Sequence, residues 1–338
     1  MKTLRLLHTL LYMAAAAIAP LVASCEHKEL CYDHPHAVQA RIDVDWSLFT
    51  EETPTGMSVM LYPKDAGGQM YTALSNNTAY VDLSVHPGTY RAVAYNQSPS
   101  EFGTITFSNM DRGDEATAYA APLTSRWYKT RADNERLVCN PEWLAVGDPL
   151  CTVSADEVAR QRGARSGTRA TIATIVPQCV VYTVDVTIHI RNAYNLRSAR
   201  ASLDGMADGF SMAQMRPTQT VATQLIEQWT LTRDADNPAN GTLHATITSF
   251  GLPWQHQSVP DANHLRLSLL LVDGTTQKDY DFLVGDAFRI SEGVDLTLTL
   301  NETIDTPLPD VKPEGGQSGG FDAKVDDWAD GGNIDIGV

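Results

Sequence analysis

The sequence predicts an all-β protein with two β-sandwich domains in tandem and an extended acidic C-terminal tail. Short runs in which apolar and polar residues alternate recur along the chain, as they do in half-buried strands. Turn pairs such as Pro87-Gly88 and Asp273-Gly274 separate such runs, which is typical of β-hairpins. No segment of the first half carries a long helical period, and the length of the chain suits two domains.

Residues 1–24 have the features of a secretion signal. Lys2 and Arg5 precede an apolar run from Leu6 to Leu21, which is shorter than the ~20 residues of a membrane-spanning helix. Small residues then lead directly into Cys25, an arrangement that resembles the lipobox of bacterial lipoproteins. The resemblance implies cleavage before Cys25 and acylation of that cysteine with chains such as palmitate. An ordinary cleaved signal is the alternative.

Composition limits the partners of the mature chain. Removing residues 1–24 from 338 leaves 314 residues, and losing Lys2 and Arg5 with them changes the net charge from −16 to −18. A chain this acidic repels nucleic acid, so we expect no nucleic-acid partner. The hydrophobic share of 43% is sufficient for packed cores, so we do not expect general disorder.

Residues 25–36 are expected to form a polar leash that Pro35 directs into the first strand. The alternative is a metal site, because this segment contains side chains that commonly bind metals: Cys31, Asp33, His34 and His36. We favour the leash and predict no metal and no cofactor beyond the covalent lipid at Cys25.

Four cysteines remain after Cys25 is assigned to the lipid, and four cysteines allow three disulfide pairings. They are Cys31, Cys139, Cys151 and Cys179. Cys139 with Cys151 is the most local pair, and we take it as the candidate disulfide in an oxidising compartment.

The first sandwich is expected over residues 37–150. Its predicted strands lie between turn signals and are mostly short, as in a β-sandwich. They are Val38–Trp46, Met57–Tyr62, Ala79–Val85, Thr89–Tyr95, Gly103–Phe107 and Leu137–Cys139.

Residues 151–172 are interpreted as the linker between the domains. The segment holds glycine and serine together with the basic cluster Arg160, Arg162, Arg165 and Arg169. The alternative is a protease-processing site, because exposed arginine-rich loops are cut readily.

The second sandwich is expected over residues 173–302. Its clearest strand runs to Ile190, with alternate residues from Val180 facing one way. Further strands are predicted at Ser198–Leu203, Leu243–Phe250, Leu265–Val272, Tyr280–Val284 and Val294–Leu300.

Residues 303–338 are interpreted as a Pro/Gly-rich acidic tail. The stretch 301–338 holds nine acidic residues and two lysines. Three apolar side chains near its end, Phe321, Val325 and Trp328, are candidates for docking as an extra strand at a sheet edge.

Motifs for catalysis are missing from the sequence. It has no Gly-x-Ser-x-Gly elbow, His-Glu-x-x-His pair or phosphate loop, so we expect no enzyme and no small-molecule substrate. Trp127-Tyr128, Trp229 and Trp254 would suit a glycan-binding surface lipoprotein of a polysaccharide-uptake system, which is our alternative function. The carboxylate pairs Asp43/Asp45 and Asp326/Asp327 are the candidates for a glycoside hydrolase, a weaker alternative.

Two stretches resemble a known family. Cys25–His36 resembles the mature start of a group of Bacteroidales surface lipoproteins. Val181–Ile190, followed by Ala201–Ala207, is similar to the strand and Leu-Ser-Gly-Met-Ala turn of fimbrillin-associated anchor proteins, with Asp204 in place of the serine. The turn Pro87–Tyr90 and the terminal Phe321–Trp328 fit the same family.

This resemblance implies two transthyretin-like, Greek-key β-sandwiches and an outer-membrane lipid anchor. It also implies an anchor or accessory role in a fimbria-like adhesive fibre, with fimbrillin-like β-protein subunits bound by β-strand addition. The acidic run that often directs surface export in this family is reduced to Glu26 and Glu29. The external and periplasmic faces of the outer membrane therefore both stay open, with the cell surface as the first expectation.

Overall fold

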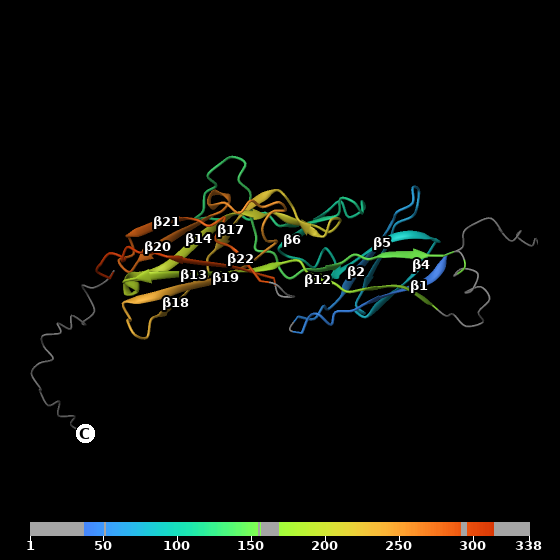
Figure 1. Ribbon diagram of the computed structural model, residues 1–338, viewed down its shortest axis with the longest axis horizontal. Coiled ribbons are helices and arrows are strands. Elements are labelled where there is room, and N and C mark those ends of the chain that lie inside the picture. Colours follow the sequence, from blue (N-terminus) through green and yellow to red (C-terminus); the bar gives the residue numbers. More distant parts are fainter. Residues whose placement is uncertain (1–36, 51, 155, 157–168, 292–295, 314–338) are drawn as a thin grey trace, which may run out of the picture.

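A computed structural model describes residues 37–50, 52–154, 156, 169–291 and 296–313. The molecule is elongated, with two β-sandwiches end to end and a smaller sheet between them (Figure 1). Apart from two short 3-10 turns, η1 (Ala193–Asn195) and η2 (Pro260–Ala262), the bounded elements are strands. The predicted all-β fold with tandem sandwiches is therefore confirmed. Within the described ranges, no helix is long and apolar enough to cross a bilayer.

The first sandwich begins with a three-stranded sheet built around β1. Val38, Ala40, Ile42 and Val44 of this strand are buried on one face, as the alternating pattern predicts. β4 pairs with β1 antiparallel, and β11 pairs with it parallel on the other side. The strands are β1 (Val38–Val44), β4 (Tyr80–Val85) and β11 (Ala170–Ile175).

A six-stranded sheet completes the first sandwich and is buried on both faces. Val59 and Leu61 face the core shared with the three-stranded sheet, whereas Met60 and Tyr62 face a second core behind it. This double burial explains why β2 is an almost unbroken apolar run. The strands are β2 (Met57–Pro63), β3 (Tyr71–Ser75), β5 (Gly88–Asn96), β9 (Ala145–Gly147), β10 (Leu150–Val153) and β12 (Gln178–Cys179).

A four-stranded sheet joins the two halves of the chain. β6 and β7 come from the first half, β15 and β16 come from the second, and β7 pairs with β15. The approach is close, since a Cβ at Gly209 would lie 2.5 Å from the carbonyl oxygen of Ala118. The strands are β6 (Ile105–Ser108), β7 (Thr117–Ala120), β15 (Gly209–Ser211) and β16 (Arg216–Pro217).

The second sandwich consists of two five-stranded sheets around one core. Alternate residues of β13 such as Val186 and Ile188 pack there with Leu267 and Leu269 of β20. The β13 sheet contains β18 (Thr230–Arg233), β19 (Asn240–Ser249), β13 (Tyr182–Arg191), β23 (Thr297–Thr303) and β22 (Arg289–Ile290). The β14 sheet contains β21 (Gln277–Leu283), β20 (His264–Leu271), β14 (Leu196–Ala207), β17 (Val221–Ile226) and β8 (Leu137–Val138).

The strand pairing differs from the predicted domain boundaries. Residues 151–153 belong to β10 and residues 170–175 form β11, and both strands are part of the first sandwich. The predicted linker therefore begins and ends in the same sandwich. After β12 of that sandwich, the chain passes to β13 of the second one between Cys179 and Tyr182. β8, predicted to close the first sandwich, pairs with β17 of the second. Composition identifies a loop but not which strands it connects.

The predicted disulfide between Cys139 and Cys151 is wrong, because both residues are free thiols. Cys151 is buried in the core of the first sandwich, while Cys139 follows β8 at the second sandwich. Burial raises the pKa of Cys151 to about 11 and also raises the pKa of Cys139. Closeness in sequence failed as a guide because the chain passes from one sandwich to the other between the two residues.

The segment after β23 is packed onto the second sandwich rather than extended. Ile304 and Leu308 are buried, and their backbone N–H groups donate to the carbonyl oxygens of His189 and Arg191 at 2.9 and 3.0 Å. Asp310 accepts a hydrogen bond from Tyr194 at 2.8 Å. Val311 also packs against the core, so residues 303–311 are part of the second sandwich rather than of the predicted tail.

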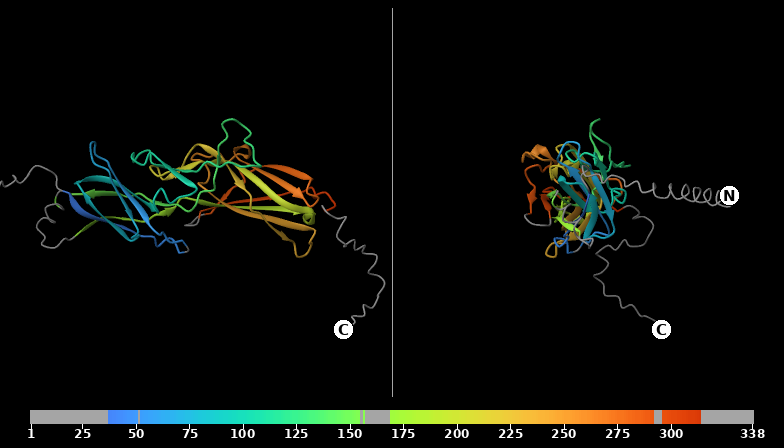
Figure 2. Two further views of the ribbon diagram at one scale, coloured as in Figure 1. Left: turned by 180° about the vertical axis from the view of Figure 1, so that it is seen from behind. Right: turned by 90° about the vertical axis from the view of Figure 1, so that its right-hand side faces the viewer.

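The described chain starts at the outer end of the first sandwich and finishes at the outer end of the second (Figures 1 and 2). Cys25 with the leash 25–36, and the candidate docking residues Phe321, Val325 and Trp328, lie outside the described residues.

Candidate functional site

The outermost strands of the sheets differ in charge. β21 carries Lys278, Asp279 and Asp281, and most other outermost strands are short or hold a charged residue. β11, with the sequence Ala-Thr-Ile-Ala-Thr-Ile, is the longest outermost strand without charge in the part of the chain that the structure describes. Charged side chains protect strand edges against pairing with other chains, and β11 lacks this protection.

The backbone of β11 presents hydrogen-bonding groups on its outer side that have no strand partner among the described residues. The N–H of Asp45 donates to the carbonyl oxygen of Ile175 at 2.8 Å, which fixes the phase of the parallel ladder with β1. Thr171 and Thr174 therefore direct their N–H and C=O groups away from β1, and both residues are exposed. A register shift makes Ile172 the extra, bulged residue of the strand.

The rest of β11 is held firmly in the first sandwich. Ile175 is fully buried in its core. On the outer face of the sheet, Arg169 binds Asp82 at 2.5 Å and Arg41 binds the same carboxylate at 3.0 Å. The Arg41 guanidinium lies 3.7 Å from the centre of the Tyr80 ring. Its hydrogen bond lowers the pKa of Asp82, so the carboxylate stays ionised.

Exposed apolar side chains surround this edge. Leu150 on β10 is 66% exposed, and Val176 directly after β11 is 45% exposed. β10 belongs to the opposite sheet, lies beside β11 and also carries no charge. We call Leu150 and Thr171–Val176 the β11 edge. It offers main-chain bonds and apolar surface together, which strand addition requires.

A second uncharged edge, β3, lies at the other margin of the six-stranded sheet. Leu74 on this strand is 63% exposed. The Tyr71 hydroxyl lies 2.6 Å from Nδ1 of His86, so the start of β3 is tied to the β4–β5 turn.

The aromatic residues predicted for a glycan surface do not gather in one place. Trp229 packs on the second core and donates from Nε1 to the carbonyl oxygen of Ile226 at 3.0 Å. Trp254 is exposed, with Arg216 4.5 Å from its ring centre. Trp127 and Tyr128 alone share a pocket, on the β14 sheet.

The carboxylate pairs predicted as hydrolase candidates are not brought into a cleft. Asp45 accepts a hydrogen bond from the backbone N–H of Ser47 at 2.9 Å, a local turn contact. Asp326 and Asp327 lie outside the described residues, as do Cys31, Asp33, His34 and His36. Over the described ranges, no group of three or more His, Cys, Asp or Glu residues could hold a metal.

Comparison with known proteins identifies one family model and one full-length curated relative that match this chain. A family model described as a domain of unknown function, DUF5119, matches residues 24–227. A curated relative from Bacteroides ovatus, provisionally named fimbrium anchoring subunit Fim4B, is 21% identical over 344 aligned positions, which cover 94% of this chain and 95% of the relative.

Several solved structures resemble this chain. A crystal structure described provisionally as an adhesin from Bacteroides ovatus matches with a TM-score of 0.56 at 16% identity, over 85% of this chain and 99% of that chain. The fimbrial anchor protein Mfa2 from Porphyromonas gingivalis matches with a TM-score of 0.42 at 10% identity, over 72% of this chain and 82% of that chain. The likeness to the Bacteroides ovatus structure shows that the two proteins share a fold.

Proposed function

The chain belongs to the DUF5119 family, and from this premise we propose that it is a lipid-anchored anchor or accessory subunit of a fimbria-like adhesive fibre. The observation that carries the proposal is the match to a relative named as a fimbrium anchoring subunit over almost the full length of both proteins. A match of that extent covers both sandwiches and the sheet between them.

The arrangement of the chain supports an anchored role. The twelve residues 25–36 separate the candidate lipid-bearing Cys25 from the first sandwich and span at most about 40 Å when fully extended. The first sandwich is therefore held near the outer membrane, while the chain leaves the second sandwich at the opposite end (Figure 1). Several acyl chains on one cysteine anchor a protein stably, which a single chain does not.

The partner in this proposal is a fimbrillin-like β-protein that adds a strand at the β11 edge. Thr171 and Thr174 supply the outward main-chain groups, and Leu150 and Val176 supply apolar contact beside them. Such binding requires neither catalysis nor a small-molecule substrate. The proposed role therefore includes no enzymatic activity and no cofactor beyond the lipid.

The experiment is a pull-down of the full-length protein from detergent-solubilised outer membranes, with mass spectrometry of the proteins that co-purify. We compare the native chain with Cys25→Ser, and we use Cys139→Ser as the matched control because Cys139 is a free thiol away from the lipid site. The expected result is a fimbrillin-like β-protein with the native chain and with Cys139→Ser, and release of Cys25→Ser from the membrane.

Recovery of a porin-type transporter in place of a fibre protein would overturn the proposal in favour of polysaccharide uptake. Protease treatment of intact cells separates the two membrane faces, because only a surface-exposed chain is degraded.

A further inference from the structure

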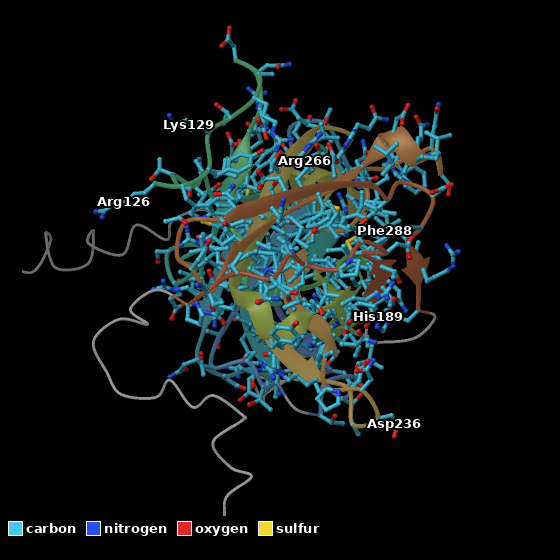
Figure 3. The ribbon with its side chains drawn as sticks, turned by 90° about the vertical axis from the view of Figure 1, so that its left-hand side faces the viewer. Arg126, Lys129, His189, Asp236, Arg266 and Phe288 are labelled. Atoms are coloured by element: carbon cyan, nitrogen blue, oxygen red, sulfur yellow. The ribbon has the colours of Figure 1, made fainter. Side chains whose placement is uncertain are left out.

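The segment between β7 and β8 lies beside the outer face of the β14 sheet and forms one side of an open pocket there. Figure 3 shows Arg126 and Lys129 on this green segment, beside the sheet that carries Arg266. The pocket has a volume of about 390 Å³, within the range of about 300–1,000 Å³ that is usual for ligand sites. We propose that it binds an acidic saccharide, a role that goes beyond fibre anchoring and rests on separate observations.

One wall of the pocket is supplied by the segment and the other by the sheet. The segment contributes two aromatic rings and two cations, and the sheet contributes neutral, acidic and basic hydrogen-bonding groups together with the Tyr280 ring. The side chains that carry the argument are Trp127, Lys129 and Arg131 on the segment, and Ser268, Gln277 and Asp279 on the sheet.

The segment is fixed in place before any ligand arrives. Glu135 accepts hydrogen bonds from the Tyr128 hydroxyl at 2.5 Å and from the Thr223 hydroxyl of β17 at 2.7 Å. Trp127 donates from Nε1 to Glu227 at 2.5 Å. Arg136 forms an ion pair with the fully buried Asp208. These contacts hold the Trp127 ring over the sheet, so binding requires little ordering of the segment.

The sheet wall is suited to sugar hydroxyls. Asp279 accepts hydrogen bonds from the Ser268 hydroxyl at 2.5 Å and from the Gln277 amide at 2.9 Å, both at Oδ1. It has no cationic partner in the part of the chain that the structure describes, so its second oxygen is available as an acceptor. Arg266 is engaged by Asp204 and Asp281 and shapes the floor of the pocket.

The segment wall calls for a negative charge on the ligand. The side chains of Arg126, Lys129 and Arg131 are exposed and make no hydrogen bond or ion pair with described residues, in a chain of net charge −16. Arg41, Arg91, Arg136, Arg169 and Arg266, by contrast, all pair with carboxylates. Lys129 and Arg131 both line the pocket, so an anion bound there is attracted by two positive charges.

These features together define the ligand class. The Arg200 guanidinium lies 5.6 Å from the centre of the Trp127 ring, so a pyranose ring stacks on the opposite face of Trp127. Its hydroxyls bind Asp279, Ser268 and Gln277, and a carboxylate, sulfate or phosphate on the sugar pairs with Lys129 and Arg131. A purely acidic peptide would satisfy the cations but leave the Asp279 carboxylate facing like charge, so the saccharide fits both walls better.

The test is a glycan array that carries uronate, sialylated, sulfated and phosphorylated oligosaccharides with neutral counterparts, probed with the full-length protein in detergent. We expect binding of acidic oligosaccharides, a loss of at least tenfold in Lys129→Ala/Arg131→Ala, and a several-fold loss in Trp127→Phe. Lys64→Ala is the matched control, since Lys64 is an exposed lysine on the first sandwich, and it should bind as the native chain does. Circular dichroism of each variant establishes that it is folded.

Three results would overturn the proposal. One is the absence of binding to every acidic glycan on the array. Another is equal binding of neutral and acidic glycans. The third is binding of a hexa-aspartate peptide as tightly as the best acidic glycan, which would assign the segment to acidic peptides.

Discussion

The two sandwiches share their layered architecture but differ in how they treat their edges. In the second, the long outermost strand β21 carries three charged residues and β18 ends in Arg233. In the first, the outermost strands β3 and β11 carry no charged residue. Leu74 on β3 is exposed, and so is Leu150 on β10 beside β11. Charged edges discourage pairing between chains, whereas uncharged ones invite it. By this criterion the long edge of the second sandwich is protected, whereas the first sandwich fits the proposed addition of a partner strand.

The largest expected effect is the loss of stability when a side chain in the core of either sandwich is truncated. Ile42 in the first core and Leu269 in the second are fully buried, so truncating either to Ala should lower the free energy of unfolding by about 2–5 kcal/mol. Leu74→Ala is the matched control, because that leucine is 63% exposed and should change stability by no more than about 0.5 kcal/mol. Urea denaturation measures all three. A Leu74→Ala effect as large as the core effects would mean that the β3 edge is covered, and the comparison would fail.

The ion pair between Arg136 and Asp208 ranks next, because it ties the segment before β8 to the second half of the chain. Asp208 is fully buried and also accepts a hydrogen bond from the Thr218 hydroxyl at 2.6 Å. Arg136→Ala leaves that carboxylate without its cation and should lower the free energy of unfolding by about 1–3 kcal/mol, less than for a fully buried pair because Arg136 is half exposed.

The control for this pair is Arg112→Ala, since Arg112 and Glu115 are both well exposed and should contribute little. Adding Asp208→Asn to Arg136→Ala should restore part of the loss. If the double variant is no more stable than Arg136→Ala, the buried charge is not the cause.

The edges themselves are compared by one substitution placed in each sandwich. Thr174 on β11 and Thr232 on β18 are both exposed residues of outermost strands. Thr174→Lys should reduce capture of the fibre subunit at least tenfold in the pull-down, because it places a charge on the open edge. Thr232→Lys should leave capture unchanged, and both should alter stability by no more than about 0.5 kcal/mol. Equal losses in both variants would remove the distinction between the sandwiches.

The smallest expected effect concerns the pKa of one aspartate in each sandwich. In the first, the hydrogen bond from Arg41 lowers the pKa of Asp82. In the second, hydrogen bonds from the Thr276 hydroxyl and from the backbone N–H groups of Thr276 and Thr275 lower the pKa of Asp273 to about 2. Both shifts favour the folded state above the ordinary value near 3.8, and the part due to Asp273 is lost as the pH falls through about 2.

NMR titration of the two carboxylates in low and high salt tests this difference. Salt should move the pKa of Asp82 back towards its ordinary value, because its partners are charged, and should leave that of Asp273 in place. Thr276→Val should raise the pKa of Asp273. A salt effect of equal size on both residues would contradict the assignment.

Much of the fold follows from the sequence, and the exceptions have physical causes. Apolar and polar residues alternate along β1 and β13 because one face of each strand is buried. This alternation can be read from neighbouring residues alone, so both strands were predicted. β11 was not predicted for two reasons. The bulge at Ile172 interrupts the alternation of apolar and polar residues, which leaves the sequence Ala-Thr-Ile-Ala-Thr-Ile, and the partner strand β1 is more than a hundred residues earlier in the chain. β8 is two residues long and pairs in the other half, which no local pattern reveals.

The candidate sites, like the strands, were predictable only where they depend on neighbouring residues in the sequence. Trp127 and Tyr128 were identifiable as aromatic residues suited to stacking, but the pocket they line depends on β20 and β21, more than a hundred residues away. Trp229 and Trp254 have the same side chain and serve packing and surface contacts instead. Residue type suggested the chemistry, whereas only the long-range register of the sheets could place it.

The most direct test of the account is site-specific photo-crosslinking in cells that assemble the fibre, with the crosslinking residue placed at position 174 or at position 232. The account predicts a covalent adduct with a fimbrillin-like β-protein from position 174 and none from position 232. An adduct only from position 232, or none from either position, would contradict the claim that the first sandwich receives the partner strand at the β11 edge.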